Sequence, residues 1–307
     1  MENNIYSMFS IEEDQKLLSN DGKFIVGKNG YIFINNDTNG VMGQITGKKR
    51  FTDRILYSWK NLLENRKKYI QNLGITYLHV SAPSKECVYS DKLPNGIYLS
   101  EERPIRQLLN TLVTSTACDI LIYPFEELVA SRSIRETYPK GDSHWNWFGG
   151  YIAYSTIVSR LGIKPIDLAE INFIDIETKS DLAEKLGRLD VVTRAKLLHN
   201  KSQLIFNNKV SKIGNLQIYQ NEDSSLPTAI IFRDSFTTQL TDFLSQHFSK
   251  MILVWQPNID FSLIELEMPN FVLAIQAERF MIKLPDDLNG LTNAQNVEIK
   301  NNPNGVL

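Results

Sequence analysis

Short apolar runs alternate along the chain with longer segments in which apolar residues recur every three or four positions. The runs predict buried strands over residues 75–80, 119–123, 228–232, 251–255 and 271–276. The three-to-four spacing predicts helices over residues 49–73, 104–113, 147–161 and 236–248. Strands that alternate with amphipathic helices are typical of an α/β fold whose sheet is mainly parallel and covered on both faces.

Three other stretches differ from this alternation. Residues 23–27 and 31–34 predict a hairpin, because the Asn29-Gly30 pair between them is typical of a tight turn. Residues 172–220 are more polar and less regular, which indicates a small insertion. Residues 285–307 are rich in Asn, Asp, Gly and Pro, so we expect a loose C-terminal tail. Residues 1–284 are accordingly expected to form a single catalytic domain.

The composition leaves room for an enzyme and argues against some partners. The 307 residues, 42% of them hydrophobic, suffice for a sizeable core. A net charge of −2 provides no global attraction to nucleic acid or to an anionic membrane. Cys87 and Cys118 form no CxxC pair and are expected to be buried free thiols. No two of the four histidines lie within five residues of each other, so we expect no metal site.

The sequence shows neither a secretory signal nor a membrane span. Its first residues lack a basic start followed by an apolar run, and no stretch approaches the length of an apolar transmembrane helix. If Met1 is the native start, we expect a cytoplasmic protein without a transmembrane segment. If a native signal precedes the sequence, a periplasmic or extracellular location is the alternative.

The apolar run at residues 228–232 leads directly into Arg233-Asp234-Ser235, and the next predicted helix begins at Phe236. In parallel α/β sheets, functional sites form at the carboxyl ends of the strands. A hydroxyl at this turn is a candidate nucleophile, and free N–H groups at the helix start can stabilise an oxyanion. The alternative is that Asp234 or Ser235 only caps the helix. The G-x-S-x-G motif of α/β-hydrolases is absent.

A serine nucleophile needs a base, and His144 is the leading candidate. It lies in a turn-rich segment ahead of the predicted helix over residues 147–161. Asp142, two residues earlier, can bond one imidazole nitrogen and leave the other for Ser235. The alternative is that Asp142 or Ser143 caps the helix while His144 packs.

Ser143 is a rival nucleophile, because Gly141-Asp142-Ser143 matches the GDS motif of the GDSL/SGNH esterases. In those enzymes the motif follows a buried strand near the start of the chain. Here the preceding residues 135–140 are mostly polar and include Pro139. We therefore reject Ser143 as the nucleophile.

Five short sequence motifs follow one another along the chain. They are a Gly-Lys-Asn-Gly hairpin at residues 27–33, a Pro-Ser-Lys loop at 83–94, an Asp-x-His-Trp-Asn segment at 138–146, Asp-Ser-Phe at 234–236 and Glu-Arg-Phe at 278–280. In content and order the chain resembles the SGNH-hydrolase-like O-acetyltransferases of bacterial polysaccharides, the alginate AlgJ/AlgX type. The Asp-x-His block followed by the Asp-Ser-Phe block is fairly specific to this family.

The resemblance implies an SGNH-hydrolase-like, flavodoxin-like three-layer sandwich with Ser235 as nucleophile, His144 as general base and Asp142 as its partner. It also implies acetyl transfer, through an acetyl-serine, to a hydroxyl of a bacterial polysaccharide or its precursor. Family members typically work in the periplasm with a signal or anchor. A cytoplasmic member is instead expected to take acetyl from acetyl-CoA, with no tightly bound cofactor.

Three further residues are candidate contacts for substrate. Trp145 can stack on a sugar ring, and Lys85 and Arg233 can meet an anionic sugar or donor; the alternatives are core packing, a solvated lysine and a structural ion pair. Two rival functions stay open: a carbohydrate esterase or deacetylase with the same triad, and a non-catalytic glycan-binding module. The sequence does not separate transferase from esterase, because the difference lies in water exclusion and acceptor binding.

Overall fold

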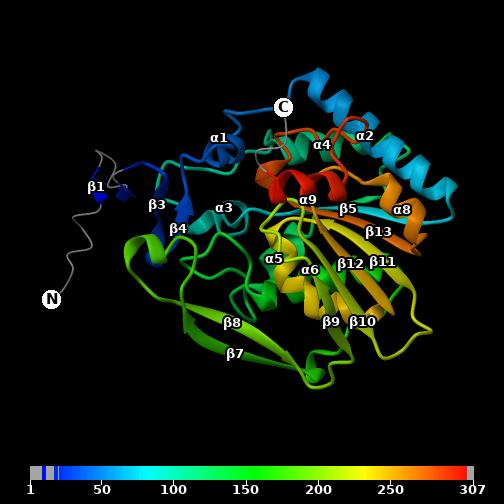
Figure 1. Cartoon of the computed structure of the whole chain (residues 1–307). Helices are drawn as coiled ribbons and strands as arrows, with labels where there is room; N and C mark the ends of the chain where they lie inside the picture. The colour runs from blue at the N-terminus through cyan, green and yellow to red at the C-terminus, as the bar shows by residue number, and fades with distance from the viewer. Residues whose placement is uncertain (1–8, 12–16, 20, 303–307) are drawn as a thin grey trace.

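The computed structural model describes residues 9–11, 17–19 and 21–302. The segments outside these ranges include residues 1–8, part of the stretch that shows no secretory signal, and residues 303–307, the end of the predicted tail. Figure 1 shows the path of the whole chain, with a large sheet and its helices at one side and a small N-terminal sheet at the other.

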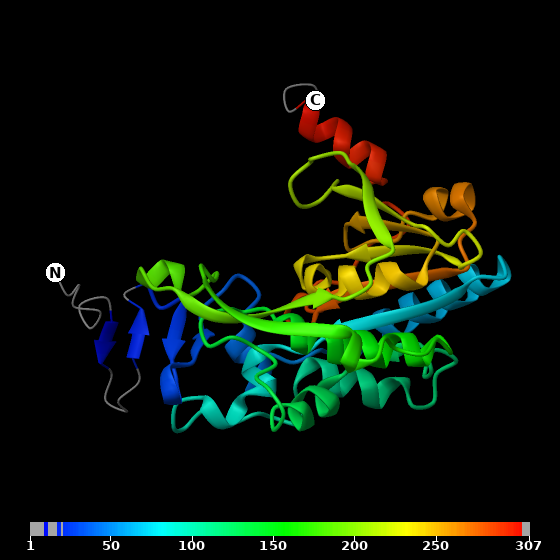
Figure 2. The ribbon, with the colours of Figure 1, turned by 90° about the horizontal axis from the view of Figure 1, so that it is seen from below.

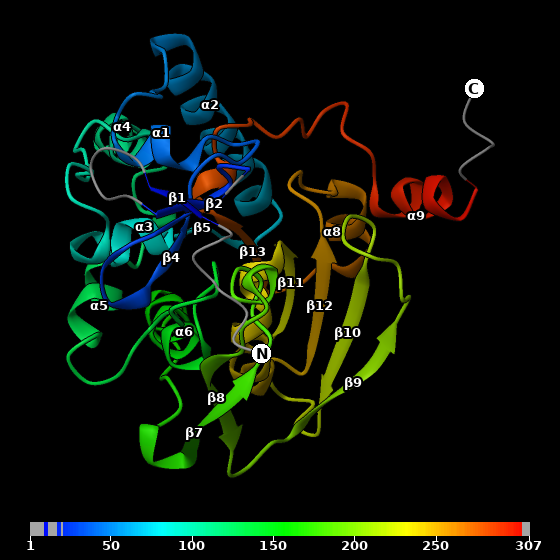
Figure 3. The ribbon, with the colours of Figure 1, turned by 90° about the vertical axis from the view of Figure 1, so that its left-hand side faces the viewer.

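The main sheet has seven strands in the order β6-β5-β13-β11-β12-β10-β9. Figure 3 shows the part of this order from β5 to β9. Its parallel strands are β6 (Leu121–Ile122), β5 (Thr76–Ala82), β13 (Phe271–Ala277), β11 (Thr228–Arg233) and β12 (Lys250–Trp255). Two antiparallel strands, β10 (Leu216–Asn221) and β9 (Ser202–Asn207), extend the sheet beyond β12. The predicted mainly parallel sheet is therefore confirmed, in a mixed form.

Apolar side chains cover both faces of the central strands β11, β12 and β13, because these strands consist mainly of apolar residues. Ile231 and Leu273 belong to one buried cluster, and their neighbours Ile230 and Val272 belong to another. The first cluster includes side chains of α6 (Trp147–Arg160) and α7 (Thr241–Leu244). The second includes side chains of α2 (Asp53–Asn72), α4 (Pro104–Leu112) and α8 (Phe261–Glu267). Helices thus pack on each face, as parallel sheets require.

The remaining helical segments are short. They include α1 (Val41–Ile45), α3 (Lys85–Val88) and α5 (Phe125–Ser131), with 3-10 turns η2 (Lys28–Gly30), η3 (Ser90–Lys92), η4 (Leu168–Glu170), η5 (Glu184–Leu186) and η8 (Glu278–Phe280). Within the described ranges, no helix combines the length and apolar character that crossing a bilayer requires.

Two smaller sheets lie beside the main one. The predicted hairpin is confirmed as β3 (Phe24–Val26) and β4 (Ile32–Ile34), with Asn29 and Gly30 at φ 57° and 77° in the turn. Strands β1 (Phe9–Ile11) and β2 (Leu17–Ser19) extend it to four antiparallel strands. Strands β7 (Ile171–Thr178) and β8 (Asp190–Leu197) form a separate antiparallel pair. Figure 2 shows this long pair reaching towards the N-terminal sheet.

The predicted insertion over residues 172–220 therefore has two parts. Its second half supplies β9 and β10 of the main sheet, whereas its first half forms the β7–β8 pair. Leu182 and Leu186, in the connection between β7 and β8, cluster with Phe24 and Ile32 of the N-terminal sheet. This contact anchors the β7–β8 connection in front of the carboxyl ends of the central strands.

The helix predicted over residues 236–248 is interrupted. Three short pieces replace it: η6 (Ser235–Leu240), α7 and η7 (Ser245–His247). Hydroxyl side chains compete here with the helix ladder, and Thr241 Oγ1 donates to the Thr237 carbonyl at 3.0 Å. Phe236, Leu240 and Phe243 still face the core as the periodicity predicts.

The C-terminal tail is not loose in residues 285–302. Helix α9 (Asn293–Asn301) begins with a capping box formed by Thr292 and Gln295. Asp287 pairs with the buried Arg66 at 2.6 Å, so the segment ahead of α9 is fixed to α2. The polar composition that suggests disorder instead supplies caps and ion pairs. Of the two free thiols, Cys87 is buried as expected but Cys118 is exposed.

Gly149 lets α6 lie close to the segment that precedes His144. A Cβ built on Gly149 would come within 2.2 Å of the Thr137 carbonyl oxygen. The Gly149 N–H also donates to Asn146 Oδ1 at 2.9 Å. Because the clash is with main chain, a side chain here would displace the loop that carries His144.

Gly149→Ala is therefore expected to destabilise the protein. The helix preference of alanine over glycine is worth about 0.5–1 kcal/mol, whereas an added methyl in a packed site costs about 1–3 kcal/mol. We expect a lower free energy of unfolding in denaturant titrations. Ser159→Ala, at an exposed position of the same helix, should change it little. Equal stability of the two variants would contradict this account of the close approach.

Candidate active site

The serine lies where the central strand β11 ends. Asp234 follows β11 and caps η6, since its side chain accepts hydrogen bonds from the N–H groups of Phe236 at 2.8 Å and Ala277 at 2.7 Å. Ala277 ends the neighbouring strand β13, so Asp234 fixes the turn to the sheet. Ser235 is half-buried. The capping role belongs to Asp234, which leaves the Ser235 hydroxyl available.

The histidine lies in the loop ahead of α6. Asn146 is the N-cap of this helix, because its side chain accepts a hydrogen bond from the Gly149 N–H. The alternative that Asp142 or Ser143 caps α6 is therefore wrong. Asp142 Oδ1 instead accepts from the His144 main-chain N–H at 2.8 Å and contacts the His144 ring Nδ1 at 2.9 Å. This tight turn is what the two-residue spacing predicts.

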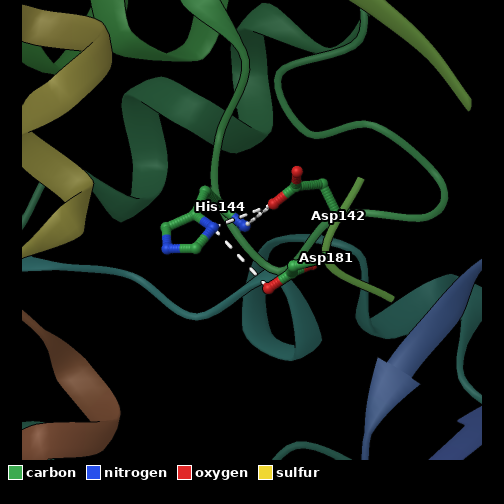
Figure 4. Close-up of side chains that lie close together, drawn as sticks. All are labelled: Asp142, His144 and Asp181. Atoms are coloured by element: carbon green, nitrogen blue, oxygen red, sulfur yellow. Dashed lines mark hydrogen bonds and ion pairs between the residues drawn. The ribbon is translucent and has the colours of Figure 1, made fainter. Parts of the chain in front are cut away.

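The structure brings Asp142, His144 and Ser235 together in that order. The other ring nitrogen of His144, Nε2, lies 2.8 Å from Ser235 Oγ. A carboxylate can only accept, so Nδ1 must carry the proton towards Asp142, and Nε2 is left to accept from the serine hydroxyl. Figure 4 shows the His144 ring with Asp142 on one side of it and its Nε2 edge pointing away.

Asp142 is held in its charged form. Burial would raise the pKa of this carboxyl, but the hydrogen bonds and charge of His144, together with the charge of Lys85, outweigh burial and lower it. An ionised Asp142 stabilises the imidazolium that would form when His144 takes a proton. The arrangement can therefore activate a serine hydroxyl near neutral pH.

A second carboxylate, Asp181, was not anticipated from the sequence. It lies in the β7–β8 connection, and its Oδ2 is 3.7 Å from His144 Nδ1 (Figure 4). It also accepts hydrogen bonds from the Ser143 main chain at 2.7 Å and from the Ser143 hydroxyl. Ser143 is buried and bonded in this way, which agrees with its rejection as nucleophile. No local motif marks Asp181, because only the fold places the insertion beside the loop.

Asp142, His144 and Asp181 each place a ligand atom within 4.8 Å of the others, a spacing that would suit a metal ion. Hydrogen bonds account for this closeness without an ion, since Asp142 binds His144 and Asp181 binds Ser143. The expectation of a metal-independent site stays a prediction.

Trp145 is a packing residue and not a sugar contact. Its side chain is 1% exposed, and its indole N–H donates to the Phe236 carbonyl at 2.8 Å. Its ring also meets the Phe236 ring edge-on, with centroids 5.1 Å apart. The predicted stacking on a sugar is wrong, because the ring is enclosed between the histidine loop and the serine turn.

Lys85 is also misassigned as a substrate contact. Its ammonium is buried and donates to the main-chain carbonyls of Lys140 at 3.0 Å and Pro139 at 3.4 Å. Burial lowers the pKa of Lys85 to about 8, against the nearby carboxylates of Glu86, Asp181 and Asp142, which raise it. Lys85 thus supports the loop that leads into Asp142, and neither substrate nor bulk solvent reaches it.

Arg233 lies at the same end of the sheet, on the strand that carries the nucleophile. It is 7% exposed and forms part of the wall of a cavity next to Asp234. Its contact with substrate stays a prediction.

One of the expected oxyanion donors is already in use. The Phe236 N–H is bonded to Asp234, whereas the Ser235 N–H has no acceptor among the residues that the structure describes. The Ser235 N–H is therefore the main-chain donor that can meet an oxyanion formed on a carbonyl attacked by Oγ.

Solved structures share this architecture at low sequence identity. A DHHW family protein from Eubacterium siraeum aligns with a TM-score of 0.63 and 14% identity, over 89% of this chain and 94% of its own. Bacillus cereus PatB1, in a structure with a sulfonyl adduct, aligns with a TM-score of 0.63 and 14% identity, over 85% and 97%. The O-acetyltransferase domain of Pseudomonas putida AlgJ gives a TM-score of 0.54 and 14% identity, over 91% and 99%.

The chain has the fold of these proteins. The resemblance to the AlgJ type predicted from the sequence is thereby confirmed at the level of the fold. No protein-family model and no curated protein sequence matches the chain.

Asp142→Asn and Asp181→Asn are expected to affect Ser235 to different degrees. Loss of the Asp142 carboxylate removes the acceptor that sets the His144 tautomer, so sulfonylation of Ser235 by a sulfonyl fluoride should slow by about 10³–10⁴-fold. Asp181 acts through Ser143, so its loss should cost about one charged hydrogen bond, or roughly tenfold. Measured rate constants in the reverse order would show that Asp181, and not Asp142, orients the ring.

Trp145→Phe should weaken the junction between the two loops. The Phe236 carbonyl would lose its donor, which costs about 1–3 kcal/mol for a buried group. Unfolding titrations should show this loss, and the sulfonylation rate should fall with it. Trp147→Phe is the matched control, because the described structure records no hydrogen bond from the Trp147 ring; a loss as large there would point to ring volume alone.

Proposed function

We propose that this protein is an O-acetyltransferase that passes an acetyl group through Ser235 to a hydroxyl of a bacterial polysaccharide or its precursor. The 2.8 Å contact between His144 Nε2 and Ser235 Oγ carries the proposal, with Asp142 behind the ring at 2.9 Å. The fold shared with the O-acetyltransferase domain of P. putida AlgJ supports acetyl as the transferred group.

In the first half-reaction, Ser235 Oγ attacks the carbonyl carbon of the acetyl donor. His144 Nε2 takes the hydroxyl proton, and the imidazolium is stabilised by Asp142. The Ser235 N–H stabilises the tetrahedral oxyanion. The donor's leaving group departs with the proton from Nε2, and acetyl-Ser235 remains.

In the second half-reaction, a sugar hydroxyl takes the place of the donor. His144 Nε2 accepts the sugar's proton as the sugar oxygen attacks the acetyl carbonyl. The bond from the carbonyl carbon to Ser235 Oγ then breaks, and the proton returns from Nε2 to Oγ. One acetyl group has moved from donor to sugar, and the protein regains its starting state.

A carbohydrate esterase or deacetylase is the second candidate. The His144 side chain is 21% exposed, so water can reach part of the imidazole. Water in place of the sugar hydroxyl gives hydrolysis by the same steps. Acceptor binding therefore decides between the two functions. Acetyl-CoA stays the donor expected from the sequence, and a chromogenic acetyl ester serves as the alternative donor in the test.

Phenylmethylsulfonyl fluoride is expected to attach to Ser235, as a sulfonyl adduct is present in one structure of B. cereus PatB1. Intact-mass analysis should show a single adduct, and peptide mapping should locate it on Ser235. Ser235→Ala should form none, whereas Ser143→Ala should still react, at a reduced rate. An adduct that persists in Ser235→Ala would reject Ser235 as the nucleophile.

An assay with an acetyl donor and a polysaccharide then distinguishes a transferase from an esterase. Wild-type protein with an acetyl donor and a polysaccharide should yield acetylated glycan, and Ser235→Ala should yield none. Release of acetate at the same rate with and without the glycan would favour the esterase. Acetylated glycan formed equally by Ser235→Ala would leave the triad without a catalytic role.

A further inference from the structure

Lys85 is a buried cation that neither half-reaction uses. Its ammonium donates to the main-chain carbonyls of Pro139 at 3.4 Å and Lys140 at 3.0 Å. It also lies over the Phe33 ring, 5.4 Å from the centroid. Among the described residues no carboxylate comes within ion-pair distance of it. Its positive charge is therefore not cancelled by any single contact.

Carboxylates from three segments of the chain surround this cation. Glu86 is its neighbour in α3, and Asp142 lies in the histidine loop. Asp181 and Asp190 come from the β7–β8 connection and from β8. Burial lowers the pKa of Lys85 to about 8, and the charges of these four residues act against burial. Because like charges oppose joint ionisation, a cation among them helps them to stay ionised together.

Main-chain hydrogen bonds tie Lys85 to the residues ahead of Asp142. The Lys140 carbonyl, which accepts from the Lys85 ammonium, also accepts from the first main-chain N–H of β4 at 2.9 Å. The carbonyl of the next residue, Gly141, accepts from the N–H groups of residues 182 and 183 at 3.0 and 2.9 Å. The histidine loop is thus held from two sides, and the ammonium is fixed to its main chain.

Asp142 responds to the charge of Lys85. Burial would raise the pKa of Asp142, but the hydrogen bonds and charge of His144 lower it, and so does the Lys85 charge. Water and salt screen buried charges little, so this effect does not need direct contact. An ionised Asp142 keeps the proton of His144 on Nδ1 and leaves Nε2 free to accept from Ser235.

We propose that Lys85 is a positioning residue whose charge keeps Asp142 ionised and thereby sets the pH range over which His144 activates Ser235. The inference rests on the proposed function, in which His144 Nε2 takes the proton of Ser235 Oγ. Lys85 is enclosed behind the histidine loop and acts through Asp142. Its loss should therefore change the pH dependence of the reaction, which the loss of a merely structural contact would leave in place.

Lys85→Met tests this charge, because methionine is similar in length and carries no ammonium. The rate of Ser235 sulfonylation would be followed over about pH 5 to 8, the range in which histidine changes its charge. The pH of half-maximal rate should rise by about half a unit or more, because the Asp142–His144 pair takes up a proton more readily without the nearby cation. Lys85→Arg retains the charge and should restore most of the original pH dependence.

Lys185→Met is the matched control. Lys185 also lies over a phenylalanine ring of the N-terminal sheet, that of Phe24, at 5.9 Å from the centroid. It belongs to the connection that carries Asp181, but its side chain is exposed, so water and salt screen its charge. The pH of half-maximal sulfonylation should stay at the wild-type value.

A second measurement leaves Lys85 itself unaltered. Two charges that stabilise each other do so reciprocally, so Asp142 must in turn help to hold the proton on Lys85. Carbon NMR of lysine labelled at Cε should show one signal, that of Lys85, titrating near pH 8 and below the ordinary lysine range. In Asp142→Asn the midpoint of this signal should be lower. This titration tests the inference even if Lys85→Met does not fold.

An unchanged pH dependence in folded Lys85→Met would overturn the inference and leave Lys85 as a structural support only. A Lys85 titration that Asp142→Asn does not move would do the same, and so would an equal shift in Lys185→Met. If the wild-type protein forms no sulfonyl adduct on Ser235, the proposed function fails instead. The NMR titration would then still report whether Lys85 and Asp142 stabilise each other.

Discussion

The hydrogen bond from the Trp145 indole N–H to the Phe236 carbonyl joins two segments that lie 91 residues apart in the sequence. On one side of it is His144, and on the other is Ser235. With both ends buried, the bond fixes how far the histidine loop lies from the serine turn. The 2.8 Å contact between His144 Nε2 and Ser235 Oγ depends on that separation, since neither side chain is long enough to correct a shifted loop.

The β7–β8 pair supports the histidine loop from the opposite side. Asp190 accepts a hydrogen bond from the Gly141 N–H at 2.7 Å, and Asp181 does the same for the Ser143 N–H at 2.7 Å. These two hydrogen bonds hold the residues on either side of Asp142, in a loop that has no regular secondary structure to fix its main chain. The polar composition of the insertion therefore has a structural reason: its carboxylates satisfy main-chain donors of a loop that has no strand partner.

Two buried cations near the site show opposite solutions to the same problem. The Lys85 ammonium donates hydrogen bonds to the main-chain carbonyls of residues 139 and 140, and several carboxylates lie near it. Arg233 has neutral side-chain partners and no ion pair among the described residues, and it borders a cavity. By residue type alone, Lys85 and Arg233 are equal candidates for contact with substrate. Their surroundings differ, because Lys85 is enclosed by the loop it supports whereas Arg233 borders a cavity.

The sequence by itself determined the central strands, most of the helices and the candidate pair Ser235 and His144. These features depend on periodicity and on a strand that ends directly in Asp-Ser, which are local signals. Only the tertiary structure decided that Trp145 and Lys85 are buried and that Asp181 approaches His144. The burial of Trp145 and Lys85 and the approach of Asp181 depend on contacts between segments far apart in the chain, and no local pattern of residues encodes which distant groups will meet. The helix over residues 293–301 does have a local signal, the capping box of Thr292 and Gln295, which the polar composition of the tail outweighed in the prediction.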